Sequence, residues 1–183
     1  MAERGDRASA DDAMERYADG EDLAFGRLYD ALEPRLRRFA LALTGSDAAA
    51  DDVIQQTLLQ IHLSRARFVR GAPVIPWAYG IARNVIRDSR RRAATEQKLA
   101  PDAPEPAMPL ADDELDRKRR RRVLDEEIAR LPEALREVFL LVNVEELPIS
   151  EVAGVLGITP ANVKVRAFRA RKLLVAAGKI RLV

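Results

Sequence analysis

The sequence contains no cysteine and only one histidine, His62, among its 183 residues. Without cysteine the chain can form neither a disulfide framework nor a thiolate metal site. A single histidine argues against a multi-histidine zinc site and a histidine-based catalytic triad. No apolar run approaches the ~20 residues of a membrane span, and the polar N-terminus lacks the apolar core of a signal peptide. We therefore expect a cytoplasmic protein with no metal, no cofactor and no membrane contact of its own.

The sequence also lacks the residue patterns that are typical of enzymes. No carboxylate pair, nucleophile–base set or glycine-rich phosphate loop has the spacing that such sites require. Glu145 and Glu146 are adjacent in the sequence, so their side chains would not share one face of a helix. The chain is therefore predicted not to be an enzyme.

The composition favours an all-α fold. Alanine, leucine, arginine and glutamate are abundant, whereas aromatic residues make up only 5% of the chain. Residues 1–19 are expected to form a flexible N-terminus. Apolar residues at helical spacing from Phe25 to Leu43 predict a helix that Pro34 should kink or split. Gly45 is expected to end this helix as a C-cap.

A second helix is predicted to follow this glycine directly. Ser46 or Asp47 can cap its N-terminus, and the helix should extend to about Arg67. Residues 68–75 are predicted to form a loop, because they include a glycine and a proline.

Residues 76–92 place two aromatics, an amide and a run of arginines on one short helix. Pro76 suits its first turn, and Trp77, Ile81 and Val85 recur every fourth residue as an apolar stripe. Aromatics can stack on bases, arginines can hold phosphates and an asparagine can contact a base edge. The alternative is a basic, solvated face on a helix whose tryptophan belongs to the core. The residues away from the stripe include Arg83, Asn84, Arg87, Arg90 and Arg91.

The composition changes sharply in residues 101–116, which contain four of the ten prolines and six acidic residues but no basic one. This pattern predicts a flexible, acidic, proline-rich linker between two small helical domains. Six consecutive basic residues, 117–122, follow it, and their role stays open. The predicted segments are a flexible N-terminus (1–19), a first domain (20–94), the linker (95–122), a second domain (123–177) and a C-terminal tail (178–183).

The second domain is predicted to be a four-helix unit that contains a helix-turn-helix. A short helix over 148–156 leads into the turn 157–159, where Thr159 can cap a basic helix. Residues 164–172 of this helix hold five basic residues and no acidic one, which suits contacts with phosphates. The alternative is an ordinary helical hairpin with a basic face.

The two motifs, in this order and separated by an acidic linker, resemble the extracytoplasmic-function (ECF) sigma factors of bacterial RNA polymerase. The resemblance extends from about Phe25 to Leu174. The segments that carry it are 46–57, similar to the family's clamp-binding helix; 77–84, similar to its minus-ten helix; 131–139, similar to the opening of its second domain; and 151–171, similar to its helix-turn-helix.

The resemblance implies a sigma factor that binds core RNA polymerase through its clamp helices and flap. It would recognise promoter DNA as duplex and as single strand, help to melt it, direct transcription initiation and be regulated by an anti-sigma factor. The implied clamp-binding residues are Asp51, Asp52, Gln55, Gln56 and Leu59. The implied minus-ten residues are Phe68, Arg70, Trp77, Arg83, Asn84, Arg87, Arg90 and Arg91, with a flipped base held by Asn84 and the loop 68–73. The implied minus-thirty-five residues are Thr159, Asn162, Lys164, Val165, Arg166 and Arg169.

This chain departs from the family pattern at four of its residues. Gln56 replaces the usual acid of the clamp-binding helix, and His62 stands where an aromatic residue is common. Asn162 and Val165 replace the usual hydroxyl residues of the recognition helix, which predicts an unusual minus-thirty-five preference. We expect His62 to be a half-buried helix residue rather than a pH sensor.

Two other interpretations stay open at this stage. The first is a helix-turn-helix regulator that acts on duplex DNA without being a polymerase subunit. The second is a sigma mimic that serves as a decoy for an anti-sigma factor. A mimic needs no DNA-facing residues, so the presence of Asn84, Arg87 and Arg166 argues against it.

Overall fold

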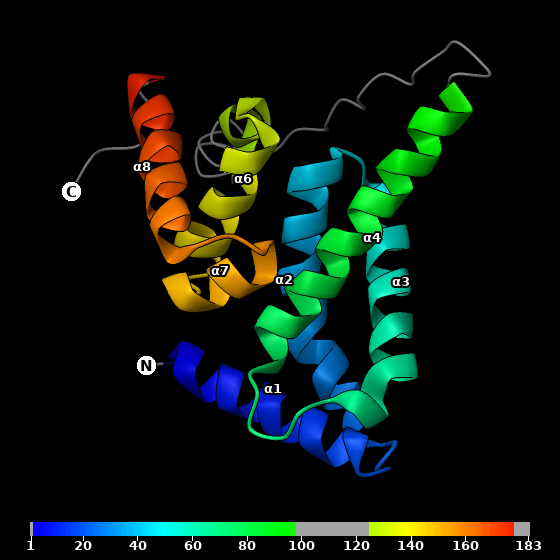
Figure 1. Ribbon diagram of the computed structural model, residues 1–183. Helices are drawn as coiled ribbons and strands as arrows, with labels where there is room; N and C mark the ends of the chain where they lie inside the picture. The colour runs from blue at the N-terminus through cyan, green and yellow to red at the C-terminus, as the bar shows by residue number, and fades with distance from the viewer. Residues whose placement is uncertain (1, 98–124, 178–183) are drawn as a thin grey trace, which may run out of the picture. The chain divides into compact units, whose positions relative to one another are not determined.

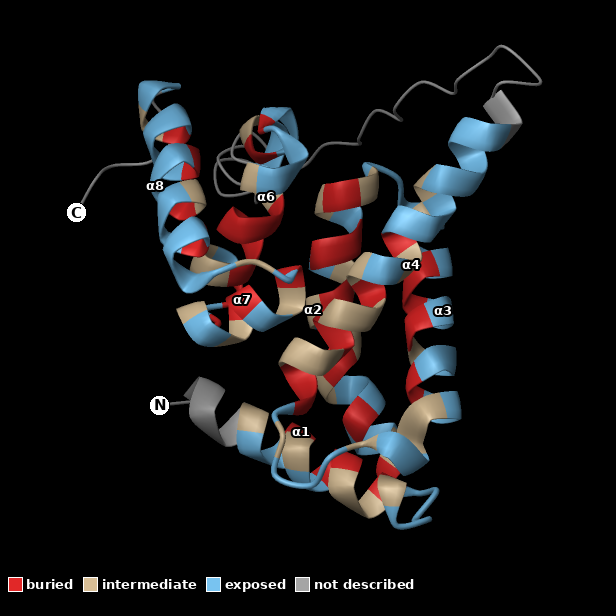
Figure 2. Ribbon diagram, in the orientation of Figure 1, coloured by how far each residue is buried: buried red, intermediate tan, exposed pale blue. Residues whose placement is uncertain are grey.

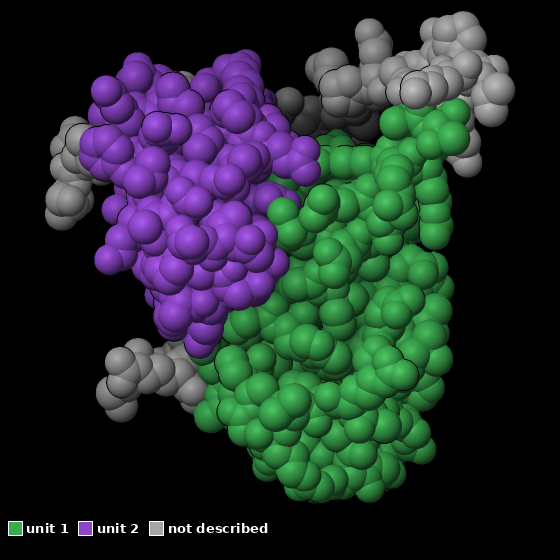
Figure 3. Space-filling model, in the orientation of Figure 1, with its two compact units in different colours: residues 1–103 green, residues 104–183 purple. Residues whose placement is uncertain are grey.

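The computed structural model describes residues 2–97 and 125–177, with side chains from residue 7 to residue 95 in the first of these ranges. The chain divides into two compact units, 1–103 and 104–183 (Figure 3). Throughout the described ranges the regular structure is helical, which confirms the predicted all-α class. Most of the predicted linker, including the basic run 117–122, and the tail 178–183 lie outside the described residues.

The first unit is a bundle in which helix α2 packs against three other helices, α1, α3 and α4 (Figure 1). Buried residues recur at helical spacing along α2, and red marks them on this helix in Figure 2. Phe39 of α2 meets Tyr79 of α4 edge to face, with ring centroids 5.1 Å apart. The elements are α1 (Ala2–Ala18), α2 (Ala24–Thr44), α3 (Asp47–Ser64), the 3₁₀ turn η1 (Arg65–Arg67) and α4 (Val74–Gln97).

The junction between α2 and α3 has the predicted local structure. Gly45 adopts a left-handed backbone (φ 71°), and its N–H donates to the carbonyl of Leu41, as expected of a C-cap. The Ser46 hydroxyl accepts a hydrogen bond from the N–H of Ala49 (3.4 Å) and so caps α3. Pro34, however, does not split α2, which continues through it. Because Pro34 is exposed while its neighbours are held by tertiary packing, the helix tolerates the lost hydrogen bond.

The prediction of a flexible N-terminus over 1–19 is wrong for the described part of α1. Ala10, Ala13, Met14 and Tyr17 recur at helical spacing and are almost fully buried. The apolar signal is weak in the sequence because two of these four residues are alanines among many charged neighbours. Their burial becomes evident only when α2 and α4 are in place, since α1 packs against both.

Helix α4 differs from its prediction in position and in its buried face. It begins at Val74, inside the segment predicted as a loop, and continues to Gln97, beyond the predicted domain end at 94. The predicted stripe of Trp77, Ile81 and Val85 is only half-buried. The core face is rotated from it, because α2 and α3 contact a neighbouring side of the helix. The buried residues are Val74, Ile75, Ala78, Tyr79, Ala82 and Ile86.

The described part of the second unit, residues 125–177, contains four helical segments, as predicted. Helix α8 packs against α6 and α7 through the buried residues Val163, Ala167, Ala170 and Leu174. The end of α6 widens into a π-helical turn, which the sequence pattern did not predict. The segments are residues 125–130, α6 (Glu133–Phe139) with the π-helical turn η2 (Leu140–Val144), α7 (Ile149–Leu156) and α8 (Pro160–Ala176).

Two glycines of the helix-turn-helix should respond to alanine in opposite directions. Gly157 ends α7 with a left-handed backbone (φ 65°). Gly157→Ala is therefore expected to destabilise the protein by about 1–2 kcal/mol. Gly154 lies inside α7 with open space where a Cβ would lie, so Gly154→Ala should stabilise the protein by roughly 0.5–1 kcal/mol. Thermal unfolding of both variants checks this, and a shift of the same sign in both would contradict it.

Candidate functional site

Helix α3 presents a continuous exposed face of mixed chemistry. Asp51, Asp52, Gln55, Gln56 and Leu59 are all exposed, and 46% of the Leu59 surface is accessible. The opposite face of α3 is buried against the bundle. The structure therefore brings the five predicted clamp-binding residues together on one surface.

Asp51 also has a structural role within this face. Its carboxylate pairs with the Arg37 guanidinium of α2 at 2.7 Å, and Arg37 pairs with Glu33 at 2.6 Å. The hydrogen bond to Glu33, followed by the one to Asp51, raises the pKa of Arg37 above its usual value. Asp51 therefore connects α3 to α2, and its negative charge is partly compensated.

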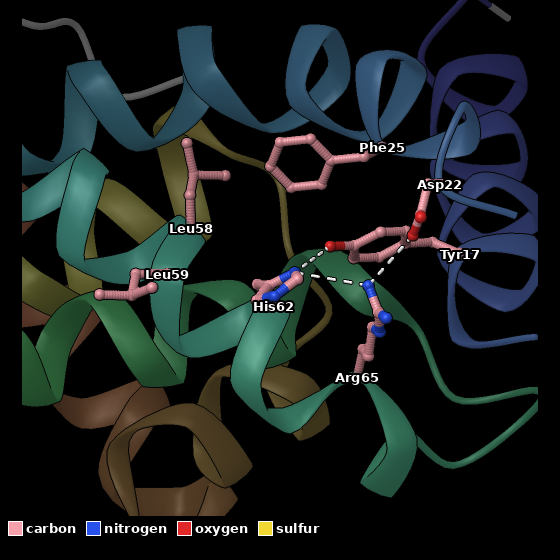
Figure 4. Close-up of a pocket in the computed structure, with 7 residues that line it drawn as sticks. All are labelled: Tyr17, Asp22, Phe25, Leu58, Leu59, His62 and Arg65. Atoms are coloured by element: carbon pink, nitrogen blue, oxygen red, sulfur yellow. Dashed lines mark hydrogen bonds and ion pairs between the residues drawn. The ribbon is translucent and has the colours of Figure 1, made fainter. Parts of the chain in front are cut away.

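A shallow hollow of about 460 Å³ adjoins the far end of this face (Figure 4). His62 Nδ1 and the Tyr17 hydroxyl share a hydrogen bond across it. The Arg65 guanidinium lies 5.0 Å from the Tyr17 ring centroid and 3.2 Å from Asp22, close enough for a cation–π contact with the ring. The hydrogen bond to Tyr17, and the charge of Asp22 more weakly, raise the pKa of Arg65. The hollow is lined by Tyr17, Asp22, Phe25, Leu58, Leu59, His62 and Arg65.

The prediction that His62 is half-buried is wrong, because the residue as a whole is exposed. The Nδ1 atom of its ring shares a hydrogen bond with the Tyr17 hydroxyl and lies 3.4 Å from the Arg65 guanidinium. The physical reason is the position of His62 on α3. It follows the buried Ile61 by one residue and therefore points away from the core.

A polar hollow of about 500 Å³ lies on α4 and is lined by Asn84, Arg87, Asp88 and Arg91. Asn84 and Arg87 are exposed, and Arg91 pairs with Asp88 at 3.1 Å. These residues lie one turn apart along the helix and offer an amide and two guanidinium groups to a ligand. The surface therefore has the chemistry to hold a base edge beside phosphates.

The other predicted minus-ten residues of α4 contribute differently. The Arg90 guanidinium donates to the carbonyl of Leu43 at 2.5 Å, so Arg90 holds the C-terminal end of α2. Arg83 is half-buried. Trp77 is half-buried as well, and its ring centroid lies 5.3 Å from that of Phe68. The structure thus separates Asn84, Arg87 and Arg91, which face outward, from the residues that also support the bundle.

The loop before α4 is held by side chains of α1, a contact that the sequence did not predict. Asp19 pairs with Arg70. Glu15 Oε1 accepts from the N–H of Gly71 (2.8 Å), and Asp11 Oδ1 accepts from the N–H of Val74 (2.7 Å). The sequence feature that could have indicated this contact is the spacing of the three carboxylates. They recur every fourth residue and so share one face of a helix.

Helix α8 exposes most of the predicted minus-thirty-five residues. Asn162, Lys164, Val165 and Arg169 are exposed, whereas Arg166 is half-buried. The Thr159 hydroxyl accepts from the N–H of Asn162 (3.3 Å), so it caps the helix.

Two further features of α8 were not assigned from the sequence. Arg171 Nε donates to Asn143 Oδ1 at 2.8 Å, and Asn143 Nδ2 donates to the carbonyl of Phe139 at 3.2 Å. These bonds fix α8 to the π-helical turn. In addition, 66% of the Phe168 surface is accessible, so a large aromatic side chain lies among the exposed basic residues of this helix.

Within the described ranges, no group of three or more potential metal ligands is present. None of the helices in these ranges is both long and apolar enough to cross a membrane.

Known families and proteins match both units. The Sigma-70 region 2 family matches residues 28–96, and the Sigma-70, region 4 family matches residues 121–174. RNA polymerase sigma factor CarQ of Myxococcus xanthus is 34% identical to this chain, over 92% of the chain and 98% of CarQ. ECF RNA polymerase sigma factor SigF of Caulobacter vibrioides is 30% identical, over 88% of the chain and 89% of SigF.

Solved structures agree with these matches. CnrH, solved in complex with the cytosolic domain of CnrY, has a TM-score of 0.67 and 28% identity, over 94% of this chain and 96% of that one. The sigma factor RpoE of Bartonella quintana, solved with the anti-sigma factor NepR, shares the fold with a TM-score of 0.70 and 23% identity, over 86% of this chain and 98% of that one. This chain therefore belongs to the ECF RNA polymerase sigma factors, non-catalytic subunits that carry sigma-70 regions 2 and 4 and direct transcription initiation.

Proposed function

We propose that this sigma factor binds core polymerase, the minus-ten element and the minus-thirty-five element through three separate exposed surfaces. These are the α3 face, the loop 68–73 together with the outer face of α4, and the exposed face of α8. The observation that carries the proposal is that most of the predicted residues are exposed, whereas other faces of the same helices are buried in the cores.

The α3 face is the surface that would dock on the clamp helices of core polymerase. Its exposed Leu59 is an apolar anchor, and the exposed Asp52, Gln55 and Gln56 precede it on the same helix. An exposed apolar side chain next to polar groups suits a specific protein interface. Because Asp51 is already paired with Arg37, its contribution to docking should be smaller than that of Asp52.

The outer face of α4 would hold the melted minus-ten element. Asn84, with the loop 68–73, would bind a flipped base, and the cost of removing that base from its stack is offset by polar and aromatic contacts. Arg87 and Arg91 would contact phosphates beside it. Arg90 should contribute less, because its guanidinium is bonded to the Leu43 carbonyl.

Helix α8 would lie in the major groove of the minus-thirty-five element. The N-terminal residues of a recognition helix usually contact base edges. Asn162 and Arg166 would therefore contact bases, and Lys164 and Arg169 would contact phosphates. The second unit would also bind the polymerase flap. Binding both DNA elements from one polymerase surface makes the second contact effectively intramolecular, so each unit can bind weakly alone.

Regulation by an anti-sigma factor also belongs to this proposal. Its support is the complex between CnrH and the cytosolic domain of CnrY, together with the exposed apolar residues Leu59 and Leu63 on α3. A partner that covers these residues would block docking on core polymerase. We place this competition in the cytoplasm, where core polymerase works.

The α3 assignment predicts that Leu59→Arg lowers the affinity for core polymerase at least about tenfold, because a charge replaces the apolar anchor. Leu41→Arg, at an exposed leucine of α2, is the matched control and should bind as the unaltered protein does. The measurement is fluorescence anisotropy of labelled protein titrated with core enzyme. Equal losses in both variants would overturn the assignment of the α3 face.

A further inference from the structure

We propose that three carboxylates of α1, from Asp11, Glu15 and Asp19, position the loop before α4 for recognition of the minus-ten element. They are positioning residues, since they act through the loop and do not themselves contact DNA. The inference deepens the proposed function, because it rests on the assignment of the loop 68–73 to the minus-ten site.

The geometry of α1 matches the course of the loop. Side chains four residues apart on a helix lie on one face, displaced by about 6 Å along its axis. Asp19, Glu15 and Asp11 therefore form a row, and their partners are, in the same order, Arg70, Gly71 and Val74. The chain from Arg70 to Val74 thus runs along α1 and is held at three successive points.

Asp11 supplies a cap that the local sequence lacks. The first N–H groups of a helix have no partner within it, and a serine, threonine or aspartate just before the helix usually accepts from one of them. Here Ala72 and Pro73 precede α4 and carry no side-chain acceptor. The N–H of Val74, the first residue of α4, donates instead to Asp11 of another helix. Helix α1 therefore determines where α4 begins.

Glu15 fixes the sharpest point of the loop. Gly71 has a left-handed backbone (φ 76°), and its N–H donates to the Glu15 carboxylate. A turn between the Ala72 N–H and the Val69 carbonyl (3.0 Å) lies next to it. A hydrogen bond to a charged acceptor is stronger than one between neutral groups, so removing the carboxylate should loosen this turn.

The loop leads directly into the proposed minus-ten surface. Phe68, at its start, contacts Trp77, and α4 carries Asn84 beyond it. A loop already held in its binding shape loses less conformational freedom when DNA binds. Asp19 adds a second effect, because its carboxylate competes with phosphates for Arg70. Asp11 and Glu15 should therefore favour DNA binding more than Asp19 does.

The test compares two double variants of the full-length protein, Asp11→Ala with Glu15→Ala and, as control, Asp12→Ala with Glu21→Ala. Both remove two negative charges, but the known partner of Asp12 and Glu21 is Arg16 rather than the loop. Alanine suits a helix, so α1 should persist. Amide hydrogen exchange at Gly71 and Val74, and acrylamide quenching of Trp77, the only tryptophan, report the loop directly.

Affinity for DNA is measured on the reconstituted holoenzyme with a labelled single strand that carries the minus-ten sequence. That sequence is obtained first, by run-off transcription of genomic fragments with the holoenzyme. The new start sites should share two spaced motifs, and one of these is the minus-ten sequence. In the Asp11/Glu15 variant we expect faster amide exchange, stronger quenching and about tenfold weaker binding of the strand. Binding to core enzyme and to minus-thirty-five duplex should stay unchanged, and the control should match the unaltered protein throughout.

Unchanged exchange and quenching in the Asp11/Glu15 variant would overturn the inference, as would a loosened loop with unaltered affinity for the strand. Arg87→Ala separates this failure from failure of the proposed function. If Arg87→Ala weakens strand binding and the α1 variant does not, only the inference fails; if neither weakens it, the minus-ten assignment itself fails. Should the double variant not fold, Glu15→Ala alone, which keeps the α4 cap, is judged by the same criteria.

Discussion

Replacing Leu36 with alanine is expected to lower the free energy of unfolding of the first unit by about 2–5 kcal/mol. Leu36 lies on α2, which packs against α1, α3 and α4, and only 1% of its surface is accessible. The substitution removes buried methyl groups and leaves a cavity that the surrounding helices can fill only in part. Urea unfolding followed by Trp77 fluorescence measures the loss for this unit, because the only tryptophan lies within it.

Leu41→Ala is the matched control for this prediction. It is the same substitution on the same helix, so the change in helix propensity is equal, but 38% of the Leu41 surface is accessible. Its loss of stability should be clearly smaller than that of Leu36→Ala. If the two losses are equal, burial against the neighbouring helices is not what stabilises α2.

Replacing Asn162 with alanine is expected to reduce discrimination between the minus-thirty-five duplex and a scrambled duplex by about 1–3 kcal/mol. The Asn162 side chain is exposed in the first turn of α8, where base contacts are expected. Its backbone N–H, which Thr159 caps, is kept in the variant, so the helix should stay intact. Competition binding with the two duplexes measures the discrimination.

Lys172→Ala provides the contrasting case, since Lys172 is exposed toward the other end of the same helix. Lys172→Ala is expected to weaken binding to both duplexes alike. The slope of log affinity against log salt concentration should become smaller by about one unit. Asn162→Ala should leave that slope unchanged. If Asn162→Ala instead weakens binding to both duplexes equally, Asn162 contacts the DNA backbone rather than a base.

The predictions that succeeded concern structure determined within a few residues. Gly45, Ser46 and Thr159 end or begin their helices as predicted, because a cap needs only a suitable side chain or backbone next to it. The exposed face of α3 was also predictable, since helical periodicity separates its polar residues from its apolar ones.

The predictions that failed depend on neighbouring helices. Helix α1 has too little apolar surface to be recognised alone, and its burial requires α2 and α4. The buried face of α4 is rotated from the Trp77 stripe for the same reason. The bond of Arg90 to the Leu43 carbonyl could not be predicted either, because it requires the end of α2 to lie beside Arg90. The contact of Arg90 with DNA stays a prediction.

The sequence by itself determined the all-helical class, the helix ends with local caps, and the basic and polar faces that resemble a sigma factor, because periodicity and capping act over a few residues. Only the tertiary structure decided which of the charged residues also support the fold. Asp11 caps a helix that begins 63 positions later in the chain, and Asp51 pairs across two helices. Such contacts join residues that no local pattern relates, so they exist only once the bundle has formed.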